Sequence, residues 1–135
     1  MAAGERKTPE YDFEEFRRAC EDKNNVFLFP AAEKKADDFF NLRTKTQVLE
    51  FIINNGLGNL KFLNKKDWKK NPDPSNPIKI DAYEFRSAFK LGYIAFMHNP
   101  KTRKWSIKSF KPSKNANQTM MHALQKAGLL ASGER

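Results

Sequence analysis

The sequence predicts an α+β domain in which N-terminal helices pack on one face of a small antiparallel sheet, followed by an extra C-terminal helix. Three observations support this prediction. Apolar residues recur at helical spacing up to residue 53, whereas from Ile78 onward they alternate with polar residues, as in strands. The 135 residues fit one domain. The 12 Phe, 2 Trp and 3 Tyr can build a core although only 39% of the residues are apolar.

The first helix is expected after residues 1–8, which we expect to form a flexible tail. Thr8-Pro9 can open this helix, because threonine caps a helix and proline suits its first position. Three apolar residues then follow at helical spacing, Phe13, Phe16 and Cys20. The apolar run at residues 26–29 is either a short strand or a buried loop.

Two further helices are expected before the middle of the chain. Residues 31–40 form the first of them. Thr44 and Gln47 have the spacing of a capping box, in which each side chain accepts a bond from a free backbone N–H of the first helical turn. They precede a strongly apolar run at residues 48–53, which we expect to be the third helix.

The second half of the chain predicts a sheet. Residues 71–77 include three prolines, which exclude a helix and a central strand and indicate an exposed connector. The first strand begins at Ile78, and Gly92 separates it from a second strand at residues 93–98. A third strand follows at residues 104–110. Three consecutive strands with short links are typical of an antiparallel meander.

The domain organisation follows from these elements. Residues 1–8 are the tail, residues 9–111 are a single domain, and residues 112–135 are a polar linker and the C-terminal helix. Pro112 is expected to end the sheet. An amphipathic pattern around Met120 and Leu124 predicts that last helix.

The positive charge of the protein is concentrated in one stretch of chain. Residues 1–60 carry 9 Lys/Arg and 11 Asp/Glu, whereas residues 61–114 carry 14 Lys/Arg and 4 Asp/Glu. Such asymmetry predicts a polyanionic partner, and we expect it to be nucleic acid. The alternative is a basic surface that only keeps the protein soluble.

Several classes of protein are not indicated. No apolar run approaches the roughly 18–20 residues that cross a bilayer, and the N-terminus has no apolar signal segment. One cysteine, Cys20, cannot form an internal disulfide, and with only two histidines, His98 and His122, we expect no histidine-rich metal site. We therefore expect a cytoplasmic protein with no membrane association and no metal.

The basic stretch has the residue types that RNA cleavage without a metal requires. Such cleavage needs a base for the 2′-hydroxyl, an acid for the leaving 5′-oxygen, and cations that stabilise the charge developing on the phosphate. Lysine, arginine and tyrosine are the abundant candidates here, and neighbouring positive charges should lower the pKa of a tyrosine or lysine among them. Four lysines surround Trp68, which either stacks on a base or packs in the core: Lys65, Lys66, Lys69 and Lys70.

Strand geometry brings one tyrosine close to one lysine. If the last hairpin is centred on Lys101, Tyr93 and Lys111 share one sheet face as diagonal neighbours, roughly 7–8 Å apart. A slip of one residue would place them on opposite faces. The alternative reading is that Tyr93 belongs to the core and Lys111 is a solvated strand end.

Over residues 11–111 the order of segments resembles the MqsR toxin family of bacterial toxin–antitoxin systems, which are RelE-like mRNA interferases. Leu63 to Lys70 is similar to a family segment that ends in a catalytic lysine. Asp81-Ala82-Tyr83 resembles a family Asp-x-Tyr, and Tyr93 falls where the family has its active-site tyrosine. Ser109-Phe110-Lys111 matches the Ser-Phe-Lys that closes the last strand. Ile80 departs from the pattern, since the family has a functional glutamine there.

The resemblance implies a RelE-like fold and a toxin endoribonuclease that cleaves mRNA. It implies no cofactor, a product with a 2′,3′-cyclic phosphate, and inhibition by a cognate antitoxin protein. The catalytic residues would be Lys70, Tyr93 and Lys111. Residues that would contact the RNA, chosen from charge and position, are Lys66, Lys69, Arg86 and Lys108.

Two other functions remain open on the sequence. The basic sheet also suits a non-catalytic nucleic-acid-binding module, which would bind RNA or DNA in a salt-sensitive way without cutting it. It also suits a protein-interaction domain whose basic face docks an acidic protein.

Overall fold

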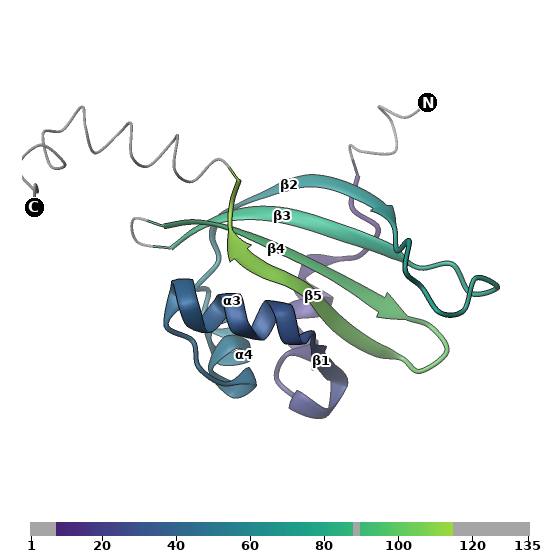
Figure 1. The fold of residues 1–135 in the computed structure, drawn as a ribbon, viewed down its shortest axis with the longest axis horizontal. Coiled ribbons are helices and arrows are strands. Elements are labelled where there is room, and N and C mark those ends of the chain that lie inside the picture. Colours follow the sequence, from purple (N-terminus) through teal and green to yellow (C-terminus); the bar gives the residue numbers. More distant parts are fainter. Residues whose placement is uncertain (1–7, 88–89, 115–135) are drawn as a thin grey trace, which may run out of the picture.

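A computed structural model describes residues 8–87 and 90–114, which form short helices and a five-stranded sheet (Figure 1). The helical elements are α2 (Phe13–Ala19), the 3₁₀ turn η1 (Lys23–Asn25), α3 (Pro30–Phe40) and α4 (Lys45–Ile53). The strands are β1 (Val26–Leu28), β2 (Gly58–Asp67), β3 (Lys79–Ser87), β4 (Lys90–Asn99) and β5 (Lys104–Pro112).

The sheet has the strand order β1-β5-β4-β3-β2. Strands β2 to β5 form an antiparallel meander, and β1 pairs with β5 in parallel. Helices α3 and α4 connect β1 at one edge of the sheet to β2 at the other, and Figure 1 shows both helices on the same side of the sheet. Of the described elements, none covers the opposite side, which we call the open face.

The predicted arrangement of the fold is wrong. The structure is α+β, but its sheet is mixed and five-stranded rather than small and antiparallel, and strands dominate over the short helices. It therefore does not have the RelE-like layout that the resemblance implied. The sequence missed β2 as a strand because two register irregularities, one between Gly58 and Lys61 and one between Phe62 and Asn64, break its alternation. The predicted C-terminal helix lies outside the described residues.

The first helix begins later than predicted. Its N-cap is Asp12, whose side chain accepts a bond from the N–H of Glu14 at 3.2 Å, rather than Thr8. The reason lies in the preceding residues. The N–H groups of Glu10 and Tyr11 bond the carboxylate of Asp81 at 2.9 Å each, which holds this segment outside the helix.

The second and third helices agree with the sequence. Helix α3 has Pro30 at its start and ends at Asn41, which adopts the left-handed conformation with φ of 59°. The hydroxyl of Thr44 accepts the N–H of Gln47 at 3.1 Å, as predicted for a capping box. The side chain of Gln47 reaches one residue further back than expected and accepts the N–H of Arg43 at 2.6 Å.

The main core lies between the helices and the sheet. Aromatic rings from both layers meet there, and Phe16 of α2 stacks on Phe96 of β4 with ring centroids 3.9 Å apart. Gly92 lies inside β4, opposite Phe85, and does not end a strand as the sequence suggested. A Cβ atom at Gly92 would lie 2.2 Å from the Phe85 ring, so glycine leaves room for that ring. The sheet ends at Pro112, as predicted, although β5 includes Lys111 and Pro112 beyond the expected strand at residues 104–110.

The register of β4 and β5 differs from the expected one. Near the hairpin His98, rather than Met97, faces Trp105. A β-bulge between Ala95 and Phe96 then takes up one extra residue of β5, Lys108. This extra residue explains why Ile107 and Phe110, three apart in sequence, both point into the core.

Candidate functional site

The open face has a hollow over the middle strands. The alanines Ala82 on β3 and Ala95 on β4 are direct cross-strand partners, and their small side chains leave space above the sheet. With Ile80 they belong to a small apolar cluster on this face. The hollow is a cavity of about 400 Å³ lined by Lys66, Asp67, Trp68, Lys69, Lys70, Ile80, Tyr93, Ala95, Lys108 and Ser109.

Residues 66–70 form one wall of this cavity. The N–H of Trp68 donates to the carbonyl oxygen of Ile78 at 2.9 Å, and the indole packs on Phe29 with ring centroids 6.3 Å apart. The connector that follows is held to the β4–β5 hairpin, because Lys101 Nζ lies 2.8 Å from a carboxylate oxygen of Asp73. These contacts fix the backbone that carries Lys69 and Lys70.

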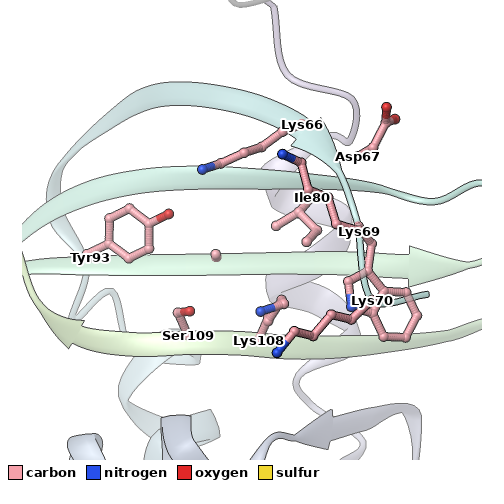
Figure 2. A pocket seen from close by; sticks show the side chains of 10 residues that line it. Lys66, Asp67, Lys69, Lys70, Ile80, Tyr93, Lys108 and Ser109 are labelled. Atoms are coloured by element: carbon pink, nitrogen blue, oxygen red, sulfur yellow. The ribbon is translucent and has the colours of Figure 1, made fainter. Parts of the chain in front are cut away.

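Tyr93 forms the end of the cavity nearest the start of β4. It lies between its cross-strand partners Glu84 on β3 and Lys111 on β5. The ammonium nitrogen of Lys111 is 5.2 Å from the centroid of the tyrosine ring, which is a cation–π contact. In Figure 2 the phenol hydroxyl points along the strand into the cavity, on the side where Lys66 extends.

The cavity is strongly positive. Lys66 and Lys69 extend over it from one side, while Lys70 extends toward β5, where Lys108 lies (Figure 2). The carboxylate among the lining residues is Asp67, which points away from the hollow and is 2.8 Å from Lys79 Nζ. That bond lowers the pKa of the Asp67 carboxyl. An anion is therefore the ligand that this cavity suits.

The ionisation state of Tyr93 differs from the sequence-based expectation. Lysines were expected to lower its pKa, but burial of the half-buried phenol raises its pKa above the ordinary value of 10.0. Tyr93 is therefore a neutral hydrogen-bond donor at neutral pH rather than a base. A neutral donor suits an anionic ligand, since the phenol O–H can point at a phosphate oxygen.

The structure brings most of the predicted site residues together. Five of the seven line the cavity: Lys66, Lys69, Lys70, Tyr93 and Lys108. Lys111 contacts Tyr93 from outside that lining. Arg86 lies near the far end of β3, two residues beyond Glu84, and does not line the cavity.

Two polar residues of the open face were not singled out as site residues in their own right. Ser109, cross-strand partner of Ala95, lines the cavity with its hydroxyl. Asn64, cross-strand partner of Ala82, has a buried side-chain oxygen with no hydrogen-bond partner. A sequence prediction of β2 as a strand would have placed Asn64 beside Ala82, on the same face as Ala95 and Ser109.

The predicted Asp-x-Tyr motif has a structural role. Asp81 is fully buried and holds the N-terminal segment, and Tyr83 packs in the core, where its ring stacks on Phe96 with centroids 5.8 Å apart. Ile80, at the position of the family glutamine, supplies only an apolar surface to the cavity.

Residues 8–87 and 90–114 contain no group of three or more His, Cys, Asp or Glu that could hold a metal ion. No helix among them has the length and apolar character that a membrane crossing requires.

In comparisons with known proteins, no family model matches the chain, and no match was found among curated proteins or solved structures.

Proposed function

We propose that the protein is a metal-independent endoribonuclease that cleaves single-stranded RNA. The observation that supports this proposal is the arrangement of one neutral tyrosine hydroxyl and the ammonium groups of four lysines around a single cavity. These groups suit a phosphate whose negative charge increases in the transition state. The cavity, about 400 Å³ and open on the sheet surface, has room for a nucleotide.

The proposed reaction is an internal transesterification. The 2′-oxygen forms a bond to the adjacent phosphorus while the bond from phosphorus to the 5′-oxygen breaks. The proton of the 2′-hydroxyl goes to water, and the ammonium group of Lys70 gives a proton to the leaving 5′-oxygen. Water then returns a proton to Lys70, so the products are a 2′,3′-cyclic phosphate and a 5′-hydroxyl.

The other groups hold the phosphate. Lys66 and Lys108 neutralise its non-bridging oxygens, and Lys69 contacts the neighbouring phosphate. The hydroxyl of Tyr93 donates to the oxygen that gains most charge, so that the phosphorus is aligned for attack. Lys111 holds the tyrosine ring in this orientation through the cation–π contact.

The biological setting is part of the same proposal. The resemblance to the MqsR toxins supports mRNA as the substrate, a cytoplasmic site of action, and a cognate antitoxin protein that suppresses cleavage. A basic cavity on an uncovered sheet face is also a surface that an acidic inhibitor segment can occupy.

The test is a cleavage assay on a single-stranded RNA oligonucleotide with a chelator present. The parent should release fragments that end in a 2′,3′-cyclic phosphate. Tyr93→Phe removes only the hydroxyl and should slow cleavage by about 10²-fold, and Lys70→Ala should slow it by about 10²- to 10³-fold. Lys34→Ala, on an exposed lysine of α3, is the matched control and should cleave at the parent rate. The proposal is refuted if the parent does not cleave the RNA, or if Tyr93→Phe and Lys70→Ala both cleave it at the parent rate.

The second candidate function is RNA binding without catalysis. Catalysis needs a base for the 2′-hydroxyl, and the raised pKa of Tyr93 keeps its phenol from being that base at neutral pH. The described residues that line the cavity include no histidine to take this role. Both observations favour binding without cleavage. Such a module would bind single-stranded RNA with an affinity that falls steeply with salt, by a log–log slope of about −0.7 per phosphate neutralised. It would leave the RNA intact at any protein concentration.

A further inference from the structure

A row of three aromatic rings begins at the cavity and reaches the edge of the sheet. We call Phe27, Phe29 and Trp68 the aromatic strip. The ring centroids of Phe27 and Phe29 are 5.3 Å apart, and those of Phe29 and Trp68 are 6.3 Å apart, both with edge-on geometry. Trp68 also lines the cavity, so the strip is continuous with it.

The outer end of the strip is unusually exposed. Phe27 is the middle residue of β1, and its neighbours Val26 and Leu28 are buried on the helix side of the sheet. Strand alternation therefore directs Phe27 to the open face, where 53% of it is exposed. At this edge position about half of the phenyl surface is open to a ligand, and its contact within the protein is with Phe29 of the same strip.

The lysines next to the aromatic strip indicate which kind of ligand binds there. Lys69 and Lys70 follow Trp68 in the chain, and Lys108 lies on β5, the strand that pairs with β1. Proteins that bind single-stranded nucleic acid combine such a positive groove with rings on which bases stack. The Asp and Glu side chains of an acidic peptide would pair with the lysines, but they have no rings to stack on the aromatic side chains. Unpaired nucleobases joined by phosphates satisfy both.

We propose that the aromatic strip stacks the unpaired bases of nucleotides next to the one held in the cavity. This inference rests on the proposed function, and it defines the substrate class further as single-stranded RNA of several nucleotides. Duplex RNA is a poor ligand in this arrangement, because its bases are already stacked and paired. The phosphates of the same nucleotides follow the lysine side chains beside the rings.

The test measures binding rather than cleavage. A fluorescent single-stranded octanucleotide in which every 2′-hydroxyl is methylated cannot be cleaved, and its affinity follows from fluorescence anisotropy. Phe27→Ala should weaken binding by between about fivefold and a hundredfold, the loss expected for one stacked base. Phe27→Tyr keeps an aromatic ring and should bind like the parent.

Two controls separate stacking from charge and from changes in folding. Phe39 is the matched residue, since it is also an exposed phenylalanine (45%) but belongs to α3 in the helix layer, and Phe39→Ala should bind like the parent. An octamer of the same backbone without bases should bind the parent and Phe27→Ala equally. Equal binding of the base-containing octamer by these two proteins overturns the inference.

The two proposals fail separately. If the parent does not cleave the matching unmethylated RNA but Phe27→Ala weakens binding of the methylated one, the strip stands and the endoribonuclease proposal fails. If the parent cleaves the RNA but Phe27→Ala and the parent bind the methylated octamer equally, the endoribonuclease proposal stands and the strip is refuted.

Discussion

Tyr93 and Lys111 are direct partners across β4 and β5, with the lysine nitrogen 5.2 Å from the centre of the tyrosine ring. The β-bulge at Lys108 makes this pairing possible, because a regular ladder continued from the hairpin would have placed Phe110 opposite Tyr93. The same bulge places Lys108 beside the cavity. One irregularity of β5 thus arranges three residues of the candidate site.

The position of Lys111 predicts a smaller catalytic effect than that of Lys70. Lys111→Ala removes a contact to the Tyr93 ring but no group that lines the cavity, and it should slow cleavage by less than about tenfold. Lys111→Arg keeps a cation over the ring and should restore the parent rate. Single-turnover cleavage rates of the three proteins check this. A loss with Lys111→Ala as large as that with Lys70→Ala would instead make Lys111 a direct phosphate ligand.

The raised pKa of Tyr93 predicts a pH-independent contribution from its hydroxyl. Because burial keeps the phenol protonated beyond the ordinary pKa of 10.0, it donates equally well throughout the range from about pH 6 to 9. The ratio of the parent rate to the Tyr93→Phe rate should therefore stay constant over that range. If the ratio rises with pH as a phenolate forms, Tyr93 acts as a base and its pKa is lowered.

Local patterns predicted the elements that depend on neighbouring residues. Helices α3 and α4 were expected from apolar spacing and from the Thr44 cap, and both are confirmed. The elements that depend on distant residues were predicted less well. Asp81, 71 residues from Glu10 in sequence, delays the start of α2, and Phe85 lets Gly92 stay within a strand. Neither contact can be predicted from the residues that neighbour Asp81 or Gly92 in the sequence.

The candidate site was predictable as chemistry but not as geometry. The lysines around Trp68 could be identified from charge and aromatic content alone. Which of them meet Tyr93 depends on the pairing of β2 with β3 and on the bulge, and both are set by tertiary packing. Arg86 illustrates the difference, since its charge matched the prediction while its distance along β3 from Ile80 takes it away from the cavity.

Gly92→Ala should destabilise the fold. The added Cβ would lie 2.2 Å from the ring of Phe85, which is fully buried and packed against other rings, so the expected loss in unfolding free energy is about 1–3 kcal/mol. Urea unfolding measures it. The double variant with Phe85→Leu, which has a smaller side chain, should lose less than the two single losses added together. Strict additivity would contradict the proposed clash.

Asp81 should contribute to stability by holding the N-terminal segment. Asp81→Ala leaves the N–H groups of Glu10 and Tyr11 without their acceptors, at an expected cost of about 1–3 kcal/mol in unfolding free energy. Asp38→Ala is the control, since it removes an exposed carboxylate paired with Lys34 on α3 and should cost at most about 1 kcal/mol. Equal losses in the two variants would mean that the Asp81 bonds add nothing.

The buried carboxyl of Asp81 also predicts a pH dependence of stability. Desolvation raises its pKa above the ordinary value of 3.8, so between the two values the folded protein binds more protons than the unfolded chain. The contribution of this group to the unfolding free energy therefore falls as pH rises through that window. Asp81→Asn cannot titrate, so the parent should lose stability relative to this variant as pH rises from about 4 toward neutrality. Parallel curves for the two proteins would show that the Asp81 pKa is not shifted by folding.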